Sequence, residues 1–395
     1  MNQRFDVVIV GGGTGGLTVA SQLEEADPSL AIAVVEPSKK HYYQPIWTLV
    51  GGGVFPKEVS ERDEADLVSP NVTLIEDRVE RFDPESNAVV LESGRTLGYG
   101  QLVVSAGLQL DWDEIPGLSE SLGKNGVGSN YSYETVDFTW NAIRTFRGGN
   151  AIFTQPNTPI KCGGAPQKIM YLAEDHFRRS GIRDKCNIQF FLPPPKIFAV
   201  AKYGNALAKL CAERDITLNH RQHLVEVRGD AKVAVFENLD DGSRKEQPFD
   251  LLHVTPPMSA PDFIKRSALV NDAGFVEVDK LTLQHVRYPN IFSLGDCSSL
   301  PTSKTGAAIR KQAPVLVENM VAARRHQPLP AAYDGYTSCP LVTGYGRLIL
   351  AEFDYDGKPQ ESFPFDQSRE RYSMYALKAY GLPEMYWHGM LRGRV

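Results

Sequence analysis

The stretch DVVIVGGGTGGL, residues 6–17, decides the fold of this chain. It opens with an apolar run that is typical of a buried strand, and the pattern G-x-G-x-x-G, from Gly11 to Gly16, then leads into a predicted helix over residues 15–25. A second apolar strand follows the helix and ends at Glu36. Strand, glycine turn, helix, strand and terminal acid in this order predict a βαβ unit that binds a dinucleotide.

The residues of the turn have separate physical roles. Gly11 permits the tight turn, and Gly13 lets the main chain approach a pyrophosphate. Gly15 and Gly16 begin the helix, where Gly16 allows close packing on the strand and the unpaired N–H groups of the helix end favour an anion. The carboxylate of Glu36 can accept hydrogen bonds from ribose hydroxyls. The alternative, a glycine-rich surface turn, leaves the acid-terminated second strand unexplained.

Elements further along the chain predict two Rossmann-like α/β domains, the first of them discontinuous. Strands are expected at residues 73–75 and 101–105, before a turn at Pro116. Strands and helices then alternate, and a strand at residues 290–296 returns the chain to the first domain. The predicted units are residues 1–115 together with 280–332, residues 116–279, and a carboxy-terminal segment, residues 333–395.

Two further motifs favour FAD over NAD as the dinucleotide of the first domain. The SLGD sequence at residues 293–296 resembles the second FAD signature of flavoproteins with two dinucleotide-binding domains, in which the aspartate contacts the ribityl-phosphate region. The VVSAG sequence at residues 103–107 resembles the strand-to-glycine motif at the junction of those domains. Asp296, Ala106 and Gly107 therefore join the predicted FAD site. A helix cap is the alternative role for Asp296.

The second domain lacks the features that hold NADH. After its first strand, residues 155–166 read QPNTPIKCGGAP in place of G-x-G-x-x-G, and the next strand ends in Pro193 to Pro195 without an acid for a ribose. We therefore expect an electron donor other than NADH. An NADH:quinone reductase of similar fold is the rival among oxidoreductases, and a flavin redox sensor without turnover is the rival from another class.

Composition excludes several classes of function. The formal net charge is −6 and no basic block is present, so nucleic acid is a poor candidate partner. No apolar run reaches the ~18 residues of a spanning helix, and the first strand begins too close to Met1 for a signal peptide, so any membrane contact is expected to be peripheral. The scattered cysteines predict neither a disulfide framework nor a metal site, and we expect thiols in a reducing compartment.

Two of the cysteines are candidates for chemistry. Cys162 lies just before a predicted helix, whose amino terminus lowers a thiol pKa, and neighbouring glycines leave its sulfur accessible. Cys339 lies in a segment that is expected to be turn-like and accessible. The two sulfurs could meet over a flavin or be two unrelated buried thiols, and spacing leaves both open. Cys186 and Cys211 are interpreted as buried, apolar side chains.

The segments around these cysteines resemble one enzyme family. Residues 159–172, residues 300–305 and the region of Cys339 are similar to the type II branch of sulfide:quinone oxidoreductase, which includes the mitochondrial enzyme. The resemblance runs essentially the whole chain. It implies a peripheral membrane enzyme with FAD, which oxidises hydrogen sulfide and reduces ubiquinone or another quinone. Some branches carry a third cysteine nearer the amino terminus, and residues 1–161 contain none, which fits type II.

The resemblance also implies how the pair works. Hydrosulfide attacks a disulfide or sulfur-bridged Cys162/Cys339 pair, the persulfide forms on Cys339, and the Cys162 thiolate adds to the flavin. Glutathione, sulfite or a second sulfide then removes the extra sulfur, and reduced FAD passes its electrons to quinone.

Four more residues are assigned to the cofactor site. The stretch HYYQP, residues 41–45, is placed beside the flavin ring by analogy, so Gln44 and Pro45 are assigned to the site, and Val79 is included with them. Lys304 could face the electron-rich end of the reduced flavin, or it could be an exposed loop lysine.

The carboxy-terminal tail, residues 367–395, combines five basic and two acidic residues with aromatic side chains. Residues 381–383, Gly-Leu-Pro, are expected to split it into two short helical pieces. Basic faces with aromatic anchors suit a bilayer interface, which predicts docking on the cytoplasmic face of a bacterial inner membrane or on a mitochondrial inner membrane. The alternative is a tail packed on the body of the protein or in a homodimer contact.

Overall fold

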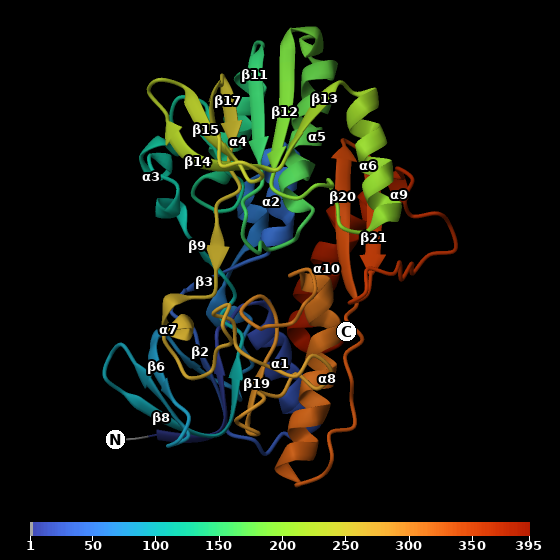
Figure 1. Ribbon diagram of the computed structural model, residues 1–395. Coiled ribbons are helices and arrows are strands. Elements are labelled where there is room, and N and C mark those ends of the chain that lie inside the picture. Colours follow the sequence, from blue (N-terminus) through green and yellow to red (C-terminus); the bar gives the residue numbers. More distant parts are fainter. Residues whose placement is uncertain (1–2) are drawn as a thin grey trace.

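The computed structural model describes residues 3–395, so the first two residues of the expected FAD-binding domain lie outside it. Figure 1 shows two α/β domains, one above the other, with the end of the chain alongside both. The first domain contains a seven-stranded sheet of order β5-β2-β1-β8-β7-β6, in which β19 also pairs with β8. Its strands are β1 (Gln3–Val10), β2 (Ile32–Val35), β5 (Thr73–Ile75), β6 (Val79–Asp83), β7 (Ala88–Leu91), β8 (Thr96–Val104) and β19 (Ile291–Ser293).

The central strands of this sheet are parallel and covered on both faces. All of Ile32–Val35 and residues 7–10 are buried, so both faces of these strands are covered, which explains the continuous apolar runs in the sequence. Helix α1 (Thr14–Ala26) follows the glycine turn and packs beside α8 (Gly306–Arg324). The predicted βαβ unit and the return of the chain through β19 are confirmed.

The second domain has a five-stranded parallel sheet of order β10-β17-β11-β12-β13. Its strands are β10 (Val127–Gly128), β11 (Gly149–Thr154), β12 (Cys186–Leu192), β13 (Ile216–His220) and β17 (Leu251–His253). Its helices are α4 (Val136–Thr145), α5 (Ala165–Arg179) and α6 (Ala201–Glu213), and an antiparallel sheet is formed by β14 (Gln222–Arg228), β15 (Val233–Asn238) and β16 (Arg244–Pro248). Residues 260–278 follow this domain in sequence, yet several of their apolar side chains pack in the core of the first domain.

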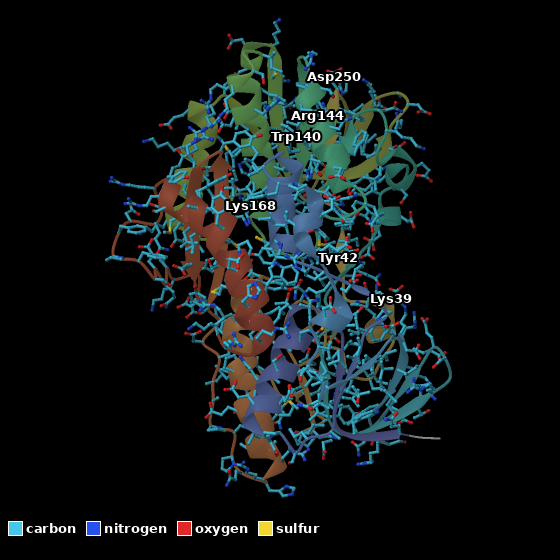
Figure 2. All side chains as sticks on the ribbon, turned by 180° about the vertical axis from the view of Figure 1, so that it is seen from behind. Lys39, Tyr42, Trp140, Arg144, Lys168 and Asp250 are labelled. Atoms are coloured by element: carbon cyan, nitrogen blue, oxygen red, sulfur yellow. The ribbon has the colours of Figure 1, made fainter. Side chains whose placement is uncertain are left out.

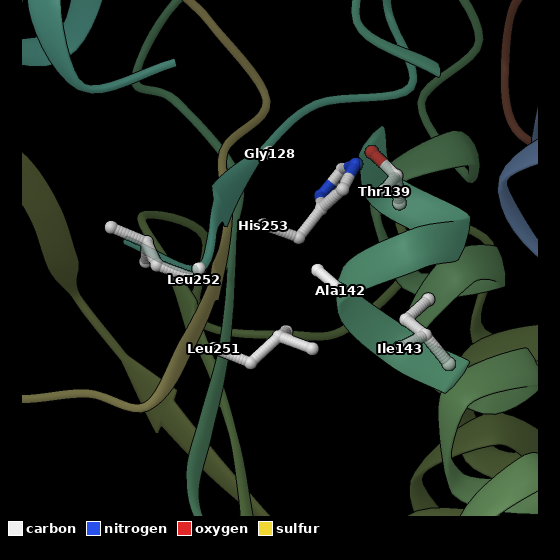
Figure 3. Close-up of a pocket in the computed structure, with 8 residues that line it drawn as sticks. Gly128, Thr139, Ala142, Ile143, Leu251, Leu252 and His253 are labelled. Atoms are coloured by element: carbon white, nitrogen blue, oxygen red, sulfur yellow. The ribbon is translucent and has the colours of Figure 1, made fainter. Parts of the chain in front are cut away.

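The space between α4 and the sheet of the second domain is almost filled (Figure 3). A cavity of about 10 Å³ lies there between Thr139 and His253, which is room for one water molecule. The main-chain N–H of Asn130 donates to Nε2 of His253 over 3.1 Å, and burial lowers the pKa of His253 to about 3. His253 is therefore a neutral core histidine, and this cavity is far too small for a nucleotide.

The carboxy-terminal segment contributes to both domains. A hairpin of β20 (Thr337–Gly344) and β21 (Arg347–Phe353) packs on α5 of the second domain, and helices then run back to the first. These helices are α9 (Tyr372–Ala376), the π turn η6 (Leu377–Gly381), α10 (Leu382–His388) and the 3₁₀ turn η7 (Met390–Arg392).

The expected break at residues 381–383 is wrong, because the helical path continues through them. The π turn ends at Gly381, and Pro383 falls in the first turn of α10, a position that proline tolerates.

Much of the tail is packed on the body of the protein. Met374, Tyr386 and Trp387 lie in the core of the first domain, whereas Tyr372 and Tyr380 are 69% and 57% exposed. Among residues 3–395 no helix combines the length and the apolarity that crossing a bilayer requires.

Candidate active site

The dinucleotide turn has the geometry that the sequence predicts for an anion cradle. Gly11 has φ +100° and a Cβ atom there would lie 2.7 Å from the carbonyl oxygen of Ser105, while a Cβ atom at Gly16 would overlap the carbonyl oxygen of Gly11. Oε2 of Glu36 accepts a hydrogen bond from the main-chain N–H of Gly12 over 2.8 Å, and burial raises the pKa of this carboxyl. The acid is thereby fixed beside the turn.

The space in front of the turn fits a bound FAD. A Cβ atom at Gly13 would meet no atom within 4 Å, and no side chain caps the amino terminus of α1. The main chain is thus open for a pyrophosphate, and the N–H groups of the first helical turn are free to bind it. A Cβ atom at Gly15, by contrast, would lie 3.4 Å from side-chain atoms of Leu294 and Ser105, at ordinary contact distance.

The predicted residues of the distal motifs lie on neighbouring strands. Ala106 and Gly107 follow β8, and Asp296 follows β19, which pairs with β8 in parallel. Gly107 has φ +69° and open space in front of it. Burial raises the pKa of Asp296, against the opposing effect of Lys304. Val79, the first residue of β6, is only 3% exposed.

Lys304 is not an exposed loop lysine. Its ammonium donates to the carbonyl oxygen of Ser298 over 3.1 Å and lies 4.5 Å from the centre of the Phe275 ring. Its own carbonyl oxygen accepts from the N–H of Cys162 over 2.7 Å, so the Cys162 loop is fastened directly to the first domain. Burial lowers the pKa of Lys304.

Gln44 and Pro45 connect the first domain to two lysines, the half-buried Lys161 and the buried Lys378. The ammonium of Lys161 donates to Oε1 of Gln44 over 2.7 Å, and that of Lys378, on η6, donates to the carbonyl oxygen of Pro45 over 2.9 Å. Burial lowers the pKa of Lys161 to about 8. Burial and the nearby Lys168 lower that of Lys378 to about 7.

The structure brings Cys162 and Cys339 together. Their sulfurs lie 3.9 Å apart as free thiols, so a disulfide requires them to approach to about 2.05 Å. Cys162 has φ +57°, a left-handed conformation that is uncommon outside glycine and turns the chain into α5.

The expected turn-like, accessible Cys339 is wrong. It lies inside β20 and is fully buried. Pro340, which suggested a turn, is tolerated because this hairpin has only two strands and leaves an edge without partners.

Lys168 is the main residue that the sequence reasoning missed. It comes from α5 (Figure 2). It is 4% exposed and donates to the sulfur of Cys162 over 3.1 Å. The hydrogen bond from Cys339 and the charge of Lys168 hold the pKa of Cys162 well below that of an ordinary thiol. Conversely, the Cys162 sulfur and burial raise the pKa of Cys339. The sequence pattern that could have identified Lys168 is a lysine on the apolar face of an amphipathic helix. Lys378 is likewise a buried lysine of a helical segment.

Two of the other cysteines lie apart from this site. Cys186 and Cys211 are buried, and burial raises the pKa of both thiols, that of Cys211 to about 11. The hydroxyl of Tyr171 lies 3.3 Å from the sulfur of Cys211. Both thiols belong to the core of the second domain, as small apolar side chains.

Comparison with known proteins agrees with this geometry. Residues 5–138 match the family model for pyridine nucleotide-disulphide oxidoreductases. The chain is 50% identical over 391 residues to mouse mitochondrial sulfide:quinone oxidoreductase, covering 99% of this chain and 87% of the mouse protein. It is 52% identical to the Dictyostelium discoideum enzyme of the same name, covering 98% and 86%.

A solved structure shares the fold along nearly the whole chain. The sulfide:quinone oxidoreductase of Aquifex aeolicus superimposes with a TM-score of 0.81 at 21% identity, over 99% of this chain and 92% of that one. The extent and identity of the sequence matches show that the chain belongs to the sulfide:quinone oxidoreductase family.

Proposed function

We propose that this FAD-dependent oxidoreductase oxidises hydrogen sulfide at the Cys162/Cys339 pair and that the two electrons pass to a membrane quinone. The observation that carries the proposal is the 3.9 Å approach of two sulfurs whose pKa values are shifted in opposite directions. Bound FAD supplies the acceptor that takes two electrons from the pair and hands them to quinone. Gly11, Gly13, Gly15, Gly16 and Glu36, with Ala106, Gly107 and Asp296, would hold it.

The asymmetry of the pair favours one direction of attack. In a disulfide, the sulfur with the lower pKa leaves more readily as thiolate. Hydrosulfide, HS⁻, would therefore bond to Sγ of Cys339, the S–S bond would break, and Cys162 would leave as a thiolate beside the Lys168 ammonium. Cys339 then carries the persulfide –S–SH. The charge of Lys168 stabilises the negative sulfur as it forms.

Removal of the outer sulfur needs a small nucleophile. We propose glutathione, sulfite or a second sulfide, which takes the sulfane sulfur and leaves Cys339 as a thiolate; loss of two electrons from the pair then restores the disulfide. A groove of about 680 Å³ offers a route to the pair, since Gly163 and Ser303 are among its lining residues. The hydroxyl of Ser303 lies 3.6 Å from the Cys339 sulfur.

The rival donor NADH finds no cradle in the second domain. Cys162 stands in the loop that would hold a pyrophosphate, and the bond from its N–H to Lys304 draws that loop onto the first domain. A sensor without turnover is less favoured, because 50% identity to an oxidoreductase extends over nearly the whole chain.

We propose a peripheral position on a quinone-containing membrane, either a mitochondrial or a bacterial inner membrane. The exposed tyrosines of the tail support it: Tyr380 lies 5.9 Å from the ring of Phe55, and Tyr372 is exposed on α9. These rings suit a bilayer interface. The same surface could instead join two copies of the chain in a homodimer. A molecular mass of two chains in lipid-free buffer would indicate the homodimer.

Cys162→Ser and Cys339→Ser should each abolish sulfide-dependent quinone reduction, because serine cannot accept sulfur and is a far weaker nucleophile. Cys186→Ser and Cys211→Ser are the matched controls and should retain turnover, with a stability cost of about 1 to 3 kcal/mol. Bound flavin should be normal in all four variants. Turnover near that of the unchanged protein in either of the first two variants would refute the two-cysteine mechanism.

Lys168→Met should shift the pH at which Cys162 becomes reactive. The thiolate alone reacts with iodoacetamide, so the alkylation rate rises as pH passes upward through the pKa. In the unchanged protein this midpoint should lie below the ordinary value of about 8.5, and loss of the ammonium should raise it by about one pH unit or more. Mass spectrometry of the Cys162 peptide measures the rate, with Lys209→Met on exposed α6 as control. An unmoved midpoint contradicts the role of Lys168.

The Tyr372→Asp/Tyr380→Asp double variant should bind quinone-containing liposomes about tenfold more weakly or worse, because two exposed apolar anchors are lost. Flotation measures the bound fraction. The Leu281→Asp/Val286→Asp variant, also exposed but outside the tail, should bind normally. Equal binding by both double variants contradicts docking through the tail. Deletion of the tail is a poor test, because Met374 and Trp387 belong to the core.

A further inference from the structure

A buried hydrogen-bonded chain connects the carboxy-terminal tail to the dinucleotide turn. The hydroxyl of Tyr386, on α10, hydrogen-bonds to Nε2 of His41 and lies 2.9 Å from Oγ1 of Thr14, the first residue of α1. On its far side, His41 places Nδ1 3.0 Å from Oε2 of Glu64. His41, Glu64 and Tyr386 are each buried. Four segments that are distant in sequence therefore meet at the start of the helix that faces the cofactor.

Every hydrogen bond of this chain can be given a donor and an acceptor. A carboxylate oxygen only accepts, so Nδ1 of His41 carries a proton and donates to Glu64, and in the tautomer with one ring proton Nε2 accepts. The Tyr386 hydroxyl then donates to Nε2 and its oxygen accepts from the hydroxyl of Thr14. In this arrangement each hydroxyl proton is used once, and the bond between Tyr386 and Thr14 belongs to the chain.

Glu64 also lies directly against the turn. A Cβ atom at Gly12 would collide with its Oε1, and among residues 3–395 no group donates a hydrogen bond to this buried oxygen. The Glu64 charge also contributes to the raised pKa of Glu36, which holds the N–H of Gly12. Glu64 is thus in contact with the part of the chain that must be correctly placed for FAD to bind.

We propose that Tyr386 is a positioning residue for FAD. Through Thr14 it fixes the amino terminus of α1, and through His41 it holds Glu64 against the glycine turn. The tail that carries the exposed membrane-facing tyrosines would then be needed to retain the cofactor, and binding of FAD would in turn stabilise the docked tail, because such coupling is reciprocal.

Other contacts in the same region support a coupled unit. The hydroxyl of Ser21, on α1, donates to the carbonyl oxygen of Leu391 over 2.9 Å. The guanidinium of Arg392 donates to the carbonyl oxygen of Asp66, two residues after Glu64. The turn η7, which follows α10, packs against α1. The end of the chain is therefore bound along the helix whose amino terminus faces the pyrophosphate.

The test is the rate at which purified holoprotein releases FAD, measured by the fluorescence of free flavin after dilution. Tyr386→Phe removes only the hydroxyl, and we expect release to become about tenfold faster, which corresponds to about 1.4 kcal/mol. Tyr375→Phe is the matched control: the same change in another buried tyrosine of the tail, outside the hydrogen-bonded chain, should leave the rate unchanged.

A double-mutant cycle separates positioning from general stabilisation. Thr14→Val keeps the shape and the N–H of Thr14 but breaks the bond to Tyr386, so it should speed release similarly, and the double variant should be no worse than Tyr386→Phe alone. If Tyr386→Phe does not give folded holoprotein, the release rate of Thr14→Val is compared with that of the Tyr375→Phe control, and faster release from Thr14→Val is the expected result. Unchanged release in Tyr386→Phe, equal acceleration in Tyr375→Phe, or fully additive effects of the two chain variants would each overturn the proposal.

Discussion

The ammonium of Lys168 beside the sulfur of Cys162 is the interaction on which the chemistry of the site depends. A buried ammonium without an anionic partner is unfavourable, and a buried thiol in apolar surroundings is unreactive, so each group compensates for the other. The hydrogen bond from Cys339 and the Lys168 ammonium, 3.1 Å away, hold the pKa of Cys162 well below that of an ordinary thiol, and the Cys162 sulfur and burial raise the pKa of Cys339. Two cysteines that are chemically identical in sequence thereby acquire different roles.

Contacts from both domains and from the carboxy-terminal segment hold Cys162 and Cys339 in place. Cys162 comes from the loop before α5, Cys339 comes from a hairpin packed on that helix, and a main-chain bond from Cys162 to Lys304 joins the loop to the first domain. The tail then adds Lys378, and Tyr386 touches the dinucleotide turn. The loop that would bind NADH in a related reductase thus carries one of the two cysteines.

Short sequence patterns predicted those elements whose structure depends on residues close together in the chain. The strand–turn–helix at Gly11 to Gly16 is dictated by apolar periodicity and by turns that only glycine permits, and it appears as predicted. The strand that holds Cys339 was missed because Pro340 suggests a turn until its partner strand is known.

Lys168 and Lys378 were missed for a different reason. A lysine in a helix is normally solvated, and only the tertiary structure shows that these two point into the protein. The chain from Glu64 to Tyr386 joins residues more than 300 positions apart, and no local pattern predicts it.

The most direct measurement is anaerobic addition of sulfide, and separately of NADH, to the purified holoprotein without quinone, followed by the visible absorbance of the flavin. Electron delivery through the cysteine pair predicts rapid bleaching by sulfide, full recovery when a soluble quinone is added, and no rapid bleaching by NADH. Rapid reduction by NADH at micromolar concentration, with an oxidised flavin that persists in sulfide, would contradict the account.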